Sequence, residues 1–275
     1  MNPHQAHPTS LIALIASIRQ HRRLIIPMIR REVTGRYKGS ILGLLWSFLN
    51  PLFMLIIYTF VFSVVFKTRW NSGGDSKTEF ALVLFAGLIV FNLFAECFNR
   101  APTLILSNVN YVKKVIFPLE ILPIVSLGAA MFHALISFGV WLIFYLILFG
   151  VPHLTVLLLP VVILPLLLFI IGISLALASL GVYLRDISQF TAIFTTVLMF
   201  LSPIFYPITA LPEKYRPLLM LNPLAPIIEQ TRGILLWGKL PDMTIFSIYL
   251  SGSVFFVWLG FVWFQKTRKG FADVL

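Results

Sequence analysis

Long stretches without a charged residue dominate the hydropathy pattern of this chain. Residues 39–66 form the first stretch and residues 121–184 the longest. A helix needs about 20 mainly apolar residues to cross the ~30 Å hydrocarbon core of a bilayer. Gly150 and Pro152 divide the longest stretch into two crossings, because these residue types favour a tight reversal. The pattern therefore predicts an all-α membrane protein with six transmembrane helices. The predicted spans are residues 41–66, 80–98, 119–149, 154–183, 187–209 and 243–265.

The segment after the fifth predicted span is rich in proline, with seven prolines between residues 203 and 241. Proline breaks helices and pushes the preceding residue toward an extended conformation. The apolar runs between these prolines, at 218–221 and 234–237, are too short to cross a membrane. We interpret residues 210–241 as short re-entrant helices on the periplasmic side. A loop that lies flat in the interface is the alternative.

The N-terminal segment, residues 10–38, has an amphipathic pattern. One apolar patch recurs at helical spacing, and a second stands among arginines. The patches are Leu11, Leu14, Ile15 and Ile18, then Leu24, Ile25, Met28 and Ile29. Such a helix lies in the membrane interface, with its guanidinium groups among lipid phosphates. A simple topogenic anchor is the alternative reading.

Composition and charge placement agree with the membrane assignment. Of the 275 residues, 59% are hydrophobic and 11% are charged, whereas soluble domains have roughly 25% charged residues. The formal net charge is +11. With six spans, both termini lie on the same side of the membrane. That side carries about twice as many basic residues as the other side, so we expect it to be cytoplasmic. Arg232 is counted among the basic residues of the opposite side. Anionic headgroups account for the net charge, so we expect no nucleic-acid partner.

The predicted spans contain few ionisable residues. His133 is the one midspan titratable candidate, and we expect it to pack between helices rather than to relay protons. Glu96 lies four residues before Arg100, a spacing at which these two side chains can pair on a helix surface near the membrane face. Carriers driven by an ion gradient bury several ionisable groups near mid-membrane. The pattern does not favour such coupling.

No nucleotide-binding loop is present in the sequence. Residues 233–239 match the start of a phosphate-binding loop, but Leu240 stands where a Ser or Thr must hold magnesium. An ATP-driven function therefore requires a separate ATPase subunit, and two polar connections on the cytoplasmic side are candidates for docking it. Ordinary solvated loops are the alternative. The docking candidates are Asn108, Asn110, Tyr111, Lys113 and Lys114 in the second connection, and Arg185 and Asp186 in the fourth.

Aromatic residues recur on the predicted spans. Trp46, Phe53 and Phe60 are spaced every seven residues in the first span, while Phe194, Phe205 and Tyr206 belong to the fifth. An aromatic face attracts the polarised C–H groups of a pyranose ring. These six residues are our candidates for a glycan channel. Packing against lipid or another helix is the alternative.

Four strings in the sequence resemble the membrane subunits of ATP-binding-cassette exporters of O-antigen, capsular and teichoic-acid polymers. They are RREVTGRYKGS at 30–40 with LGLLW at 42–46 and PL at 51–52, NYVKKVIFP at 110–118, RDI at 185–187 with SPIFYP at 202–207, and NPLAPII at 222–228. Each string alone is weak, but four in family order cover most of the chain.

This resemblance implies a non-hydrolytic, pore-forming subunit in the bacterial inner membrane. It implies a homodimer bound to two ATPase subunits, which hold ATP and magnesium, while this chain binds no cofactor. The cargo is expected to be a lipid-linked polysaccharide, an O-antigen first and a capsular polymer next, moved from cytoplasm to periplasm. The N-terminal helix would be a gate, and residues 99–118 would contain the coupling helix.

The resemblance also suggests a role for the basic residues before the first span. Arg30, Arg31, Arg36 and Lys38 are expected to meet the phosphates of the lipid anchor, because guanidinium groups match phosphate geometry. Two other functions remain open. One is the permease of a small-molecule or drug exporter. The other is a membrane enzyme acting on lipid-linked sugars, which the scattered acidic residues disfavour.

Overall fold

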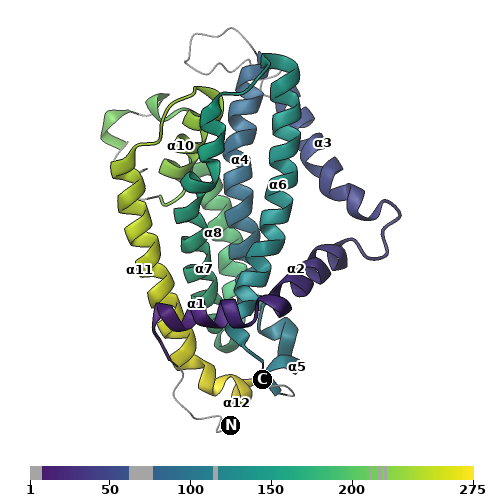
Figure 1. Cartoon of the computed structure of the whole chain (residues 1–275), viewed down its shortest axis with the longest axis vertical. Helices are drawn as coiled ribbons and strands as arrows, with labels where there is room; N and C mark the ends of the chain where they lie inside the picture. The colour runs from purple at the N-terminus through teal and green to yellow at the C-terminus, as the bar shows by residue number, and fades with distance from the viewer. Residues whose placement is uncertain (1–7, 62–76, 114–116, 211, 216–218, 220–221) are drawn as a thin grey trace.

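The computed structural model describes residues 8–61, 77–113, 117–210, 212–215, 219 and 222–275. All regular elements in these ranges are helical (Figure 1). The α-helices are α1 (Leu11–Gln20), α2 (Arg22–Arg36), α3 (Trp46–Phe60), α4 (Lys77–Arg100), α5 (Val109–Lys113), α6 (Leu122–Phe149), α7 (Leu159–Tyr183), α8 (Ile187–Leu201), α10 (Ala225–Leu236), α11 (Met243–Thr267) and α12 (Phe271–Val274). Short 3₁₀ turns are η1 (Gly43–Leu45), η3 (Ala101–Thr103), η4 (Leu106–Asn108), η5 (Leu119–Ile121), η6 (Leu154–Leu158), η7 (Ile208–Ala210), η8 (Glu213–Tyr215) and η9 (Arg268–Gly270).

Five helical stretches in the described part of the chain are long and apolar enough to cross a membrane. They are Gly43–Phe60, Glu79–Thr103, Leu119–Phe149, Leu154–Tyr183 and Met243–Val274. The fifth predicted span corresponds to α8, a shorter apolar helix of 15 residues that ends at Leu201 rather than at 209. Ser202 is extended, with φ −86° and ψ 147°, because the following Pro203 disfavours the helical conformation.

Helix α4 is the central element of the bundle, and α6, α8, α10 and α7 surround it (Figure 1). In its most apolar stretch 83% of the residues are buried, compared with 11% in the stretch at Gly43–Phe60. Helix α3 lies at the side of the bundle, where it contacts α4 and α6. Most of the α3 surface is therefore left for lipid or another chain.

Helices α7 and α11 have the most extensive contact in the molecule, and glycine makes it possible. A Cβ atom added to Gly260 would lie 2.1 Å from the carbonyl oxygen of Gly172, and one added to Gly172 would lie 2.5 Å from that of Phe256. Small residues let the backbones of two membrane helices approach closely, so that van der Waals packing holds them together. We call this contact the α7–α11 seam.

The turn predicted at Gly150 and Pro152 is present. Helix α6 ends at Phe149, and Gly150 has φ +80°, a conformation that favours glycine. In the N-terminal segment, two helices replace the single helix that the pattern predicted. The break is at His21, whose ring Nδ1 hydrogen-bonds to the Ser17 carbonyl oxygen at 2.8 Å and caps the end of α1.

The proline-rich segment contains α10, whose residues are nearly all buried against α4 and α7. The predicted apolar run at 234–237 forms its last turn, whereas most of the run at 218–221 lies outside the described residues. Irregular backbone near a membrane is tolerated when protein surrounds it. Residues 210–241 therefore contain a buried helix, and its identity as a re-entrant helix on the periplasmic side stays a prediction.

Arg232 of α10 is completely buried, at 0% exposure. Its guanidinium donates to the carbonyl oxygens of Val83 at 2.9 Å and Ile204 at 2.8 Å, and to that of Pro203, and it pairs with Glu229 at 3.0 Å. The interpretation of Arg232 as a charge among headgroups was therefore wrong. Its hydrogen bonds join α4, α10 and the turn after α8 instead.

Candidate functional site

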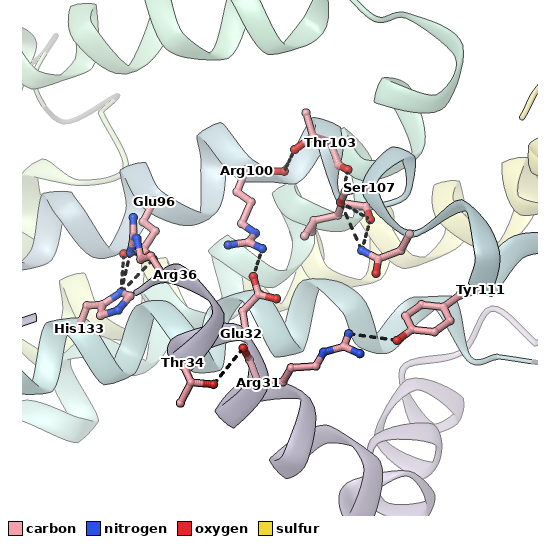
Figure 2. Close-up of polar contacts among 12 residues, drawn as sticks. Arg31, Glu32, Thr34, Arg36, Glu96, Arg100, Thr103, Ser107, Tyr111 and His133 are labelled. Carbon is pink, nitrogen blue, oxygen red and sulfur yellow. Dashed lines mark hydrogen bonds and ion pairs between the residues drawn. The ribbon is translucent and has the colours of Figure 1, made fainter. Parts of the chain in front are cut away.

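The C-terminal end of α2 lies against α4 and α6, and charged side chains from all three helices meet there (Figure 2). Nη1 of Arg36 is 2.7 Å from Oε1 of Glu96. Nδ1 of His133 is 3.0 Å from the same oxygen and 2.9 Å from the Arg36 nitrogen. This contact joins residues that are far apart in the sequence and links the end of α2 to α4 and α6.

Tyr37 completes this cluster, with its hydroxyl 3.4 Å from Nε2 of His133. Burial raises the pKa of the Tyr37 phenol, although the neighbouring Arg36 acts in the opposite direction. The phenol therefore keeps its proton at neutral pH and remains a hydrogen-bond donor.

A second ion pair joins Arg100 of α4 to Glu32 of α2 (Figure 2). The spacing allowed Arg100 to pair with Glu96, but Glu96 pairs with Arg36 and His133 instead. Glu32 and Arg36 are one helical turn apart, and so are Glu96 and Arg100. Each helix therefore offers an acid and a base that match the other helix, and we call these four residues the α2–α4 clasp.

A hydrogen bond connects α2 to the predicted coupling segment. Nη2 of Arg31 donates to the hydroxyl of Tyr111 in α5 at 3.0 Å (Figure 2). The Tyr111 ring stacks on Phe117 with a centroid distance of 4.3 Å. The aromatic stack fixes the ring, so that the hydroxyl is held toward α2.

The remaining coupling candidates lie around α5 and at the turn from α7 to α8. The Asn108 amide donates to the Leu104 carbonyl at 2.9 Å, and Asn110 and Lys113 are exposed. Lys114 lies outside the described residues. Arg185 and Asp186 are exposed in the α7–α8 turn. Both regions lie at the end of the bundle where α12 contacts α5 and α7 (Figure 1).

The four residues predicted to meet anchor phosphates fall into two classes. Arg31 and Arg36 are engaged by Tyr111 and Glu96. Arg30 and Lys38 are exposed, and their side chains form no hydrogen bond or ion pair with any residue that the structure describes. These two cations are therefore the ones available to an anionic group from outside the chain.

The aromatic candidates are divided between α3 and α8, which both contact α4. Trp46, Phe53 and Phe60 are 39%, 48% and 58% exposed on α3. The Phe194 ring of α8 is 5.7 Å from that of Phe98 in α4. Phe205 and Tyr206 are half-buried in the turn after α8, where the Tyr206 hydroxyl donates to the Phe200 carbonyl at 3.2 Å.

A cavity of about 740 Å³ opens between α3, α4 and α6, with the end of α2 at one side. This volume is within the range of small-molecule sites, roughly 300–1,000 Å³. Arg36, Glu96, Arg100 and His133 line it, so the clasp forms one wall. The predicted channel residues of α3 do not line this cavity, because they are on another face of the helix.

The clasp and its contact with His133 are the functional features that sequence reasoning missed. His133 and Glu96 are ionisable residues within or near apolar spans. Such residues rarely remain unpaired in a membrane protein, and they commonly pair with one another. That signal was available, but the sequence alone did not identify Glu32 and Arg36 as the partners on α2.

Known proteins are similar to this chain along most of its length. The O-antigen export system permease protein RfbA of Myxococcus xanthus is 28% identical over 265 residues, covering 96% of this chain and 99% of that protein. A protein of the same name from Klebsiella pneumoniae is 28% identical over 254 residues, covering 92% of this chain and 95% of its own length. The polysialic acid transport protein KpsM of Escherichia coli is 26% identical over 221 residues, covering 77% and 81%.

The family model described as ABC-2 type transporter matches residues 23–236, from the start of α2 to the end of α10. The match includes the clasp, the predicted coupling segment and five of the predicted spans. It confirms the resemblance drawn from the four sequence strings. This chain belongs to the ABC-2 type transporter family and is a non-catalytic membrane subunit of it.

Proposed function

We propose that this chain is the permease subunit of an ATP-driven exporter that moves a lipid-linked polysaccharide across the bacterial inner membrane. An O-antigen is the first candidate cargo and a capsular polymer the second. The observation that carries this proposal is the similarity, along almost the whole of both chains, to an O-antigen export system permease. The partial similarity to a polysialic acid transport protein supports the wider substrate class.

The energy for export comes from two ATPase subunits, which hold ATP and magnesium. Residues 233–236, which begin the string that resembles a phosphate-binding loop, are helical and lie at the end of α10. The ATPase subunits dock at the end of the bundle that presents α5 and the α7–α8 turn. Asn110, Lys113, Arg185 and Asp186 are exposed there for contact.

The chain crosses the membrane six times in this proposal, with both termini in the cytoplasm. Helix α8 has 15 residues and is about 22 Å long at 1.5 Å per residue, which is less than the ~30 Å hydrocarbon core. The turn after α8 and the buried helix α10 fill the remaining depth on the periplasmic side. The position of α1 and α12 at the same end supports an even number of crossings (Figure 1).

A homodimer provides the conduit. Helix α3 is the least buried of the long apolar stretches, and its exposed rings form a surface for a second copy or for the glycan. Arg30 and Lys38 lie at the mouth of this conduit and contact the anchor phosphates, since they have no partner among the described residues. A signal from the ATPase reaches α2 through Tyr111 and Arg31.

The test uses the native host, with the chromosomal copy of the gene deleted and the full chain supplied on a plasmid. The tagged chain is expected to co-purify with an ATPase subunit, and its deletion is expected to abolish surface glycan. Replacement of Lys113 by Glu should weaken the co-purification, whereas the same change at Lys239, at the opposite end of the bundle, should not. Unchanged surface glycan in the deletion strain would refute the proposal, and altered resistance to small apolar compounds would favour the drug-exporter alternative.

A further inference from the structure

Helix α4 presents a polar stripe on one face of an otherwise apolar span. Asn92, Glu96 and Asn99 follow one another at spacings of four and three residues, so they share this face. Asn92 and Asn99 are exposed and Glu96 is partly exposed, although most of α4 is buried. Polar groups at membrane depth are tolerated when they adjoin protein partners or a water-filled space. The stripe lines the 740 Å³ cavity.

The other walls of this cavity are also polar. Asn50 of α3 and Ser137 of α6 face it, beside the aromatic ring of Tyr58. The side-chain amides of Asn50 and Asn92 form no hydrogen bond with any part of the chain that the structure describes. Asn99 accepts one hydrogen bond, from Thr195 at 2.9 Å, and its amide donors remain available. Helices α3 and α4 thus direct three amide groups with unused hydrogen-bonding capacity into one space.

The charges of the cavity wall are already balanced. Arg36 is paired with Glu96, and Arg100 is paired with Glu32. An anionic ligand would have to displace a carboxylate from one of these arginines. A neutral ligand with many hydroxyl groups requires no such exchange, because carboxamides both donate and accept hydrogen bonds. The available groups therefore favour a neutral, polyhydroxylated ligand over a phosphate.

We infer that this cavity is a glycan subsite, in which Asn50 and Asn92 hydrogen-bond to sugar hydroxyls while Tyr58 contacts the pyranose face. This inference rests on the proposed function and adds a specific contact to it. The subsite holds the polymer by directional hydrogen bonds, in contrast to the aromatic rings of α3, which provide a surface without fixed polar contacts. It also disfavours small apolar cargo, since such cargo would leave the amides unpaired.

The first experiment removes the amides and keeps their size. Asn50→Leu and Asn92→Leu are combined in the full chain in its native host, and surface glycan is measured at equal permease level. The loss of two net hydrogen bonds, each worth about fivefold, predicts a roughly thirtyfold fall in export. A chain with Asn92→Gln in place of Asn92→Leu keeps this amide, and it should recover part of the lost export. Ser251→Ala is the matched control, because the Ser251 hydroxyl donates only to the Ser247 carbonyl of its own helix.

The second experiment measures whether the glycan occupies the cavity. In a Cys97→Ala background, Asn92→Cys is labelled with a small water-soluble thiol reagent in open membrane fragments. Fragments from cells that make the polymer should label several-fold more slowly than fragments from cells that do not. Thr244→Cys, at the exposed start of α11, should label at the same rate in both.

The outcomes separate this inference from the proposed function. Two results together would exclude the subsite. The double Leu variant would export as much glycan as the wild-type chain, and the polymer would not protect the cysteine of Asn92→Cys from labelling. Protection by the lipid anchor in cells that make no polymer would also overturn it, because the cavity would then be an anchor site. If the wild-type chain exports no glycan, the proposed function itself fails.

Discussion

The guanidinium of Arg31 and the hydroxyl of Tyr111 are 3.0 Å apart, which places the amphipathic helix α2 in direct contact with α5 in the predicted coupling segment. The two residues are 80 positions apart in the sequence. Movement of α5 by a docked ATPase would therefore reach α2 without passing through the spanning helices. Removal of one atom, the Tyr111 hydroxyl oxygen, breaks this contact.

Tyr111→Phe keeps the ring stacked on Phe117 and removes the hydroxyl that accepts from Arg31. We expect the fold and ATPase binding to persist, while the amount of glycan exported per ATP hydrolysed falls. The contact is exposed, so its loss should cost no more than about 1 kcal/mol of stability. ATP turnover and surface glycan, measured in the same strain, check this prediction.

Tyr183→Phe is the control for this change. It removes another hydroxyl near the same end of the bundle, one that donates to the Thr267 carbonyl at 2.7 Å, and it should leave the ratio of export to ATP turnover unchanged. Equal ratios in Tyr111→Phe and wild type would show that the hydrogen bond transmits nothing.

The α2–α4 clasp should respond to charge reversal. Arg36→Glu places two acids together and should release the end of α2 from α4, whereas the double variant Arg36→Glu, Glu96→Arg restores opposite charges. The Arg36 side chain is 51% exposed, so the coupling energy between the two sites should be about 1 kcal/mol. A double-mutant cycle on the melting temperature in detergent measures this energy. Additive effects of the two single changes would exclude a direct interaction.

Buried Arg232 should be among the most sensitive positions for stability. Arg232→Met removes the donors to the carbonyls of Val83, Pro203 and Ile204 and leaves Glu229 without its partner. Breaking a buried charged network of this kind costs about 3–5 kcal/mol, so the melting temperature in detergent should fall sharply.

The same substitution at Lys239 is the control for Arg232. Lys239 is exposed, and its ammonium lies 5.6 Å from the ring centroid of Trp237, so Lys239→Met should change stability by less than about 1 kcal/mol. Similar melting temperatures for the two variants would contradict the structural role of Arg232.

The α7–α11 seam provides a prediction with a control on the same helix. A methyl group at Gly260 would collide with the Gly172 carbonyl, whereas a Cβ at Gly252 meets no atom within 4 Å. Gly260→Ala should destabilise the chain by about 1–3 kcal/mol through overpacking. Gly252→Ala should be neutral or slightly stabilising, because alanine favours helix. Detergent melting curves compare them, and equal melting temperatures would exclude the close approach.

The positions of the long helices were predictable, because a charge-free stretch of sufficient length has few alternatives to a membrane helix. The turn at Gly150 followed from local chemistry in the same way. Helix α8 ends early because Pro203 acts on the residue before it, which is also a local effect. The residues after Pro203 are apolar, so the hydropathy pattern extended the predicted span beyond this point. Local rules therefore account for most of the elements and for part of their boundaries.

The pairing of charges was less predictable. The spacing of Glu96 and Arg100 satisfies the rule for a helical pair, yet each side chain forms its ion pair with a residue of α2. A rule based on sequence spacing considers one helix and contains no information about its neighbours. Arg232 was misread for the same reason, since a count of basic residues does not distinguish a buried guanidinium from one beside a headgroup.

The seam at Gly172 and Gly260 also determines how the subunit can deform. Two backbones in direct contact cannot slide past each other without a collision or part without leaving a void, so α7 and α11 behave as a rigid frame. Helix α3 has little of its surface fixed by this frame, and α2 is held to α4 by side chains that can exchange partners. A deformation of the subunit is therefore expected to displace α2 and α3 more than α7 and α11.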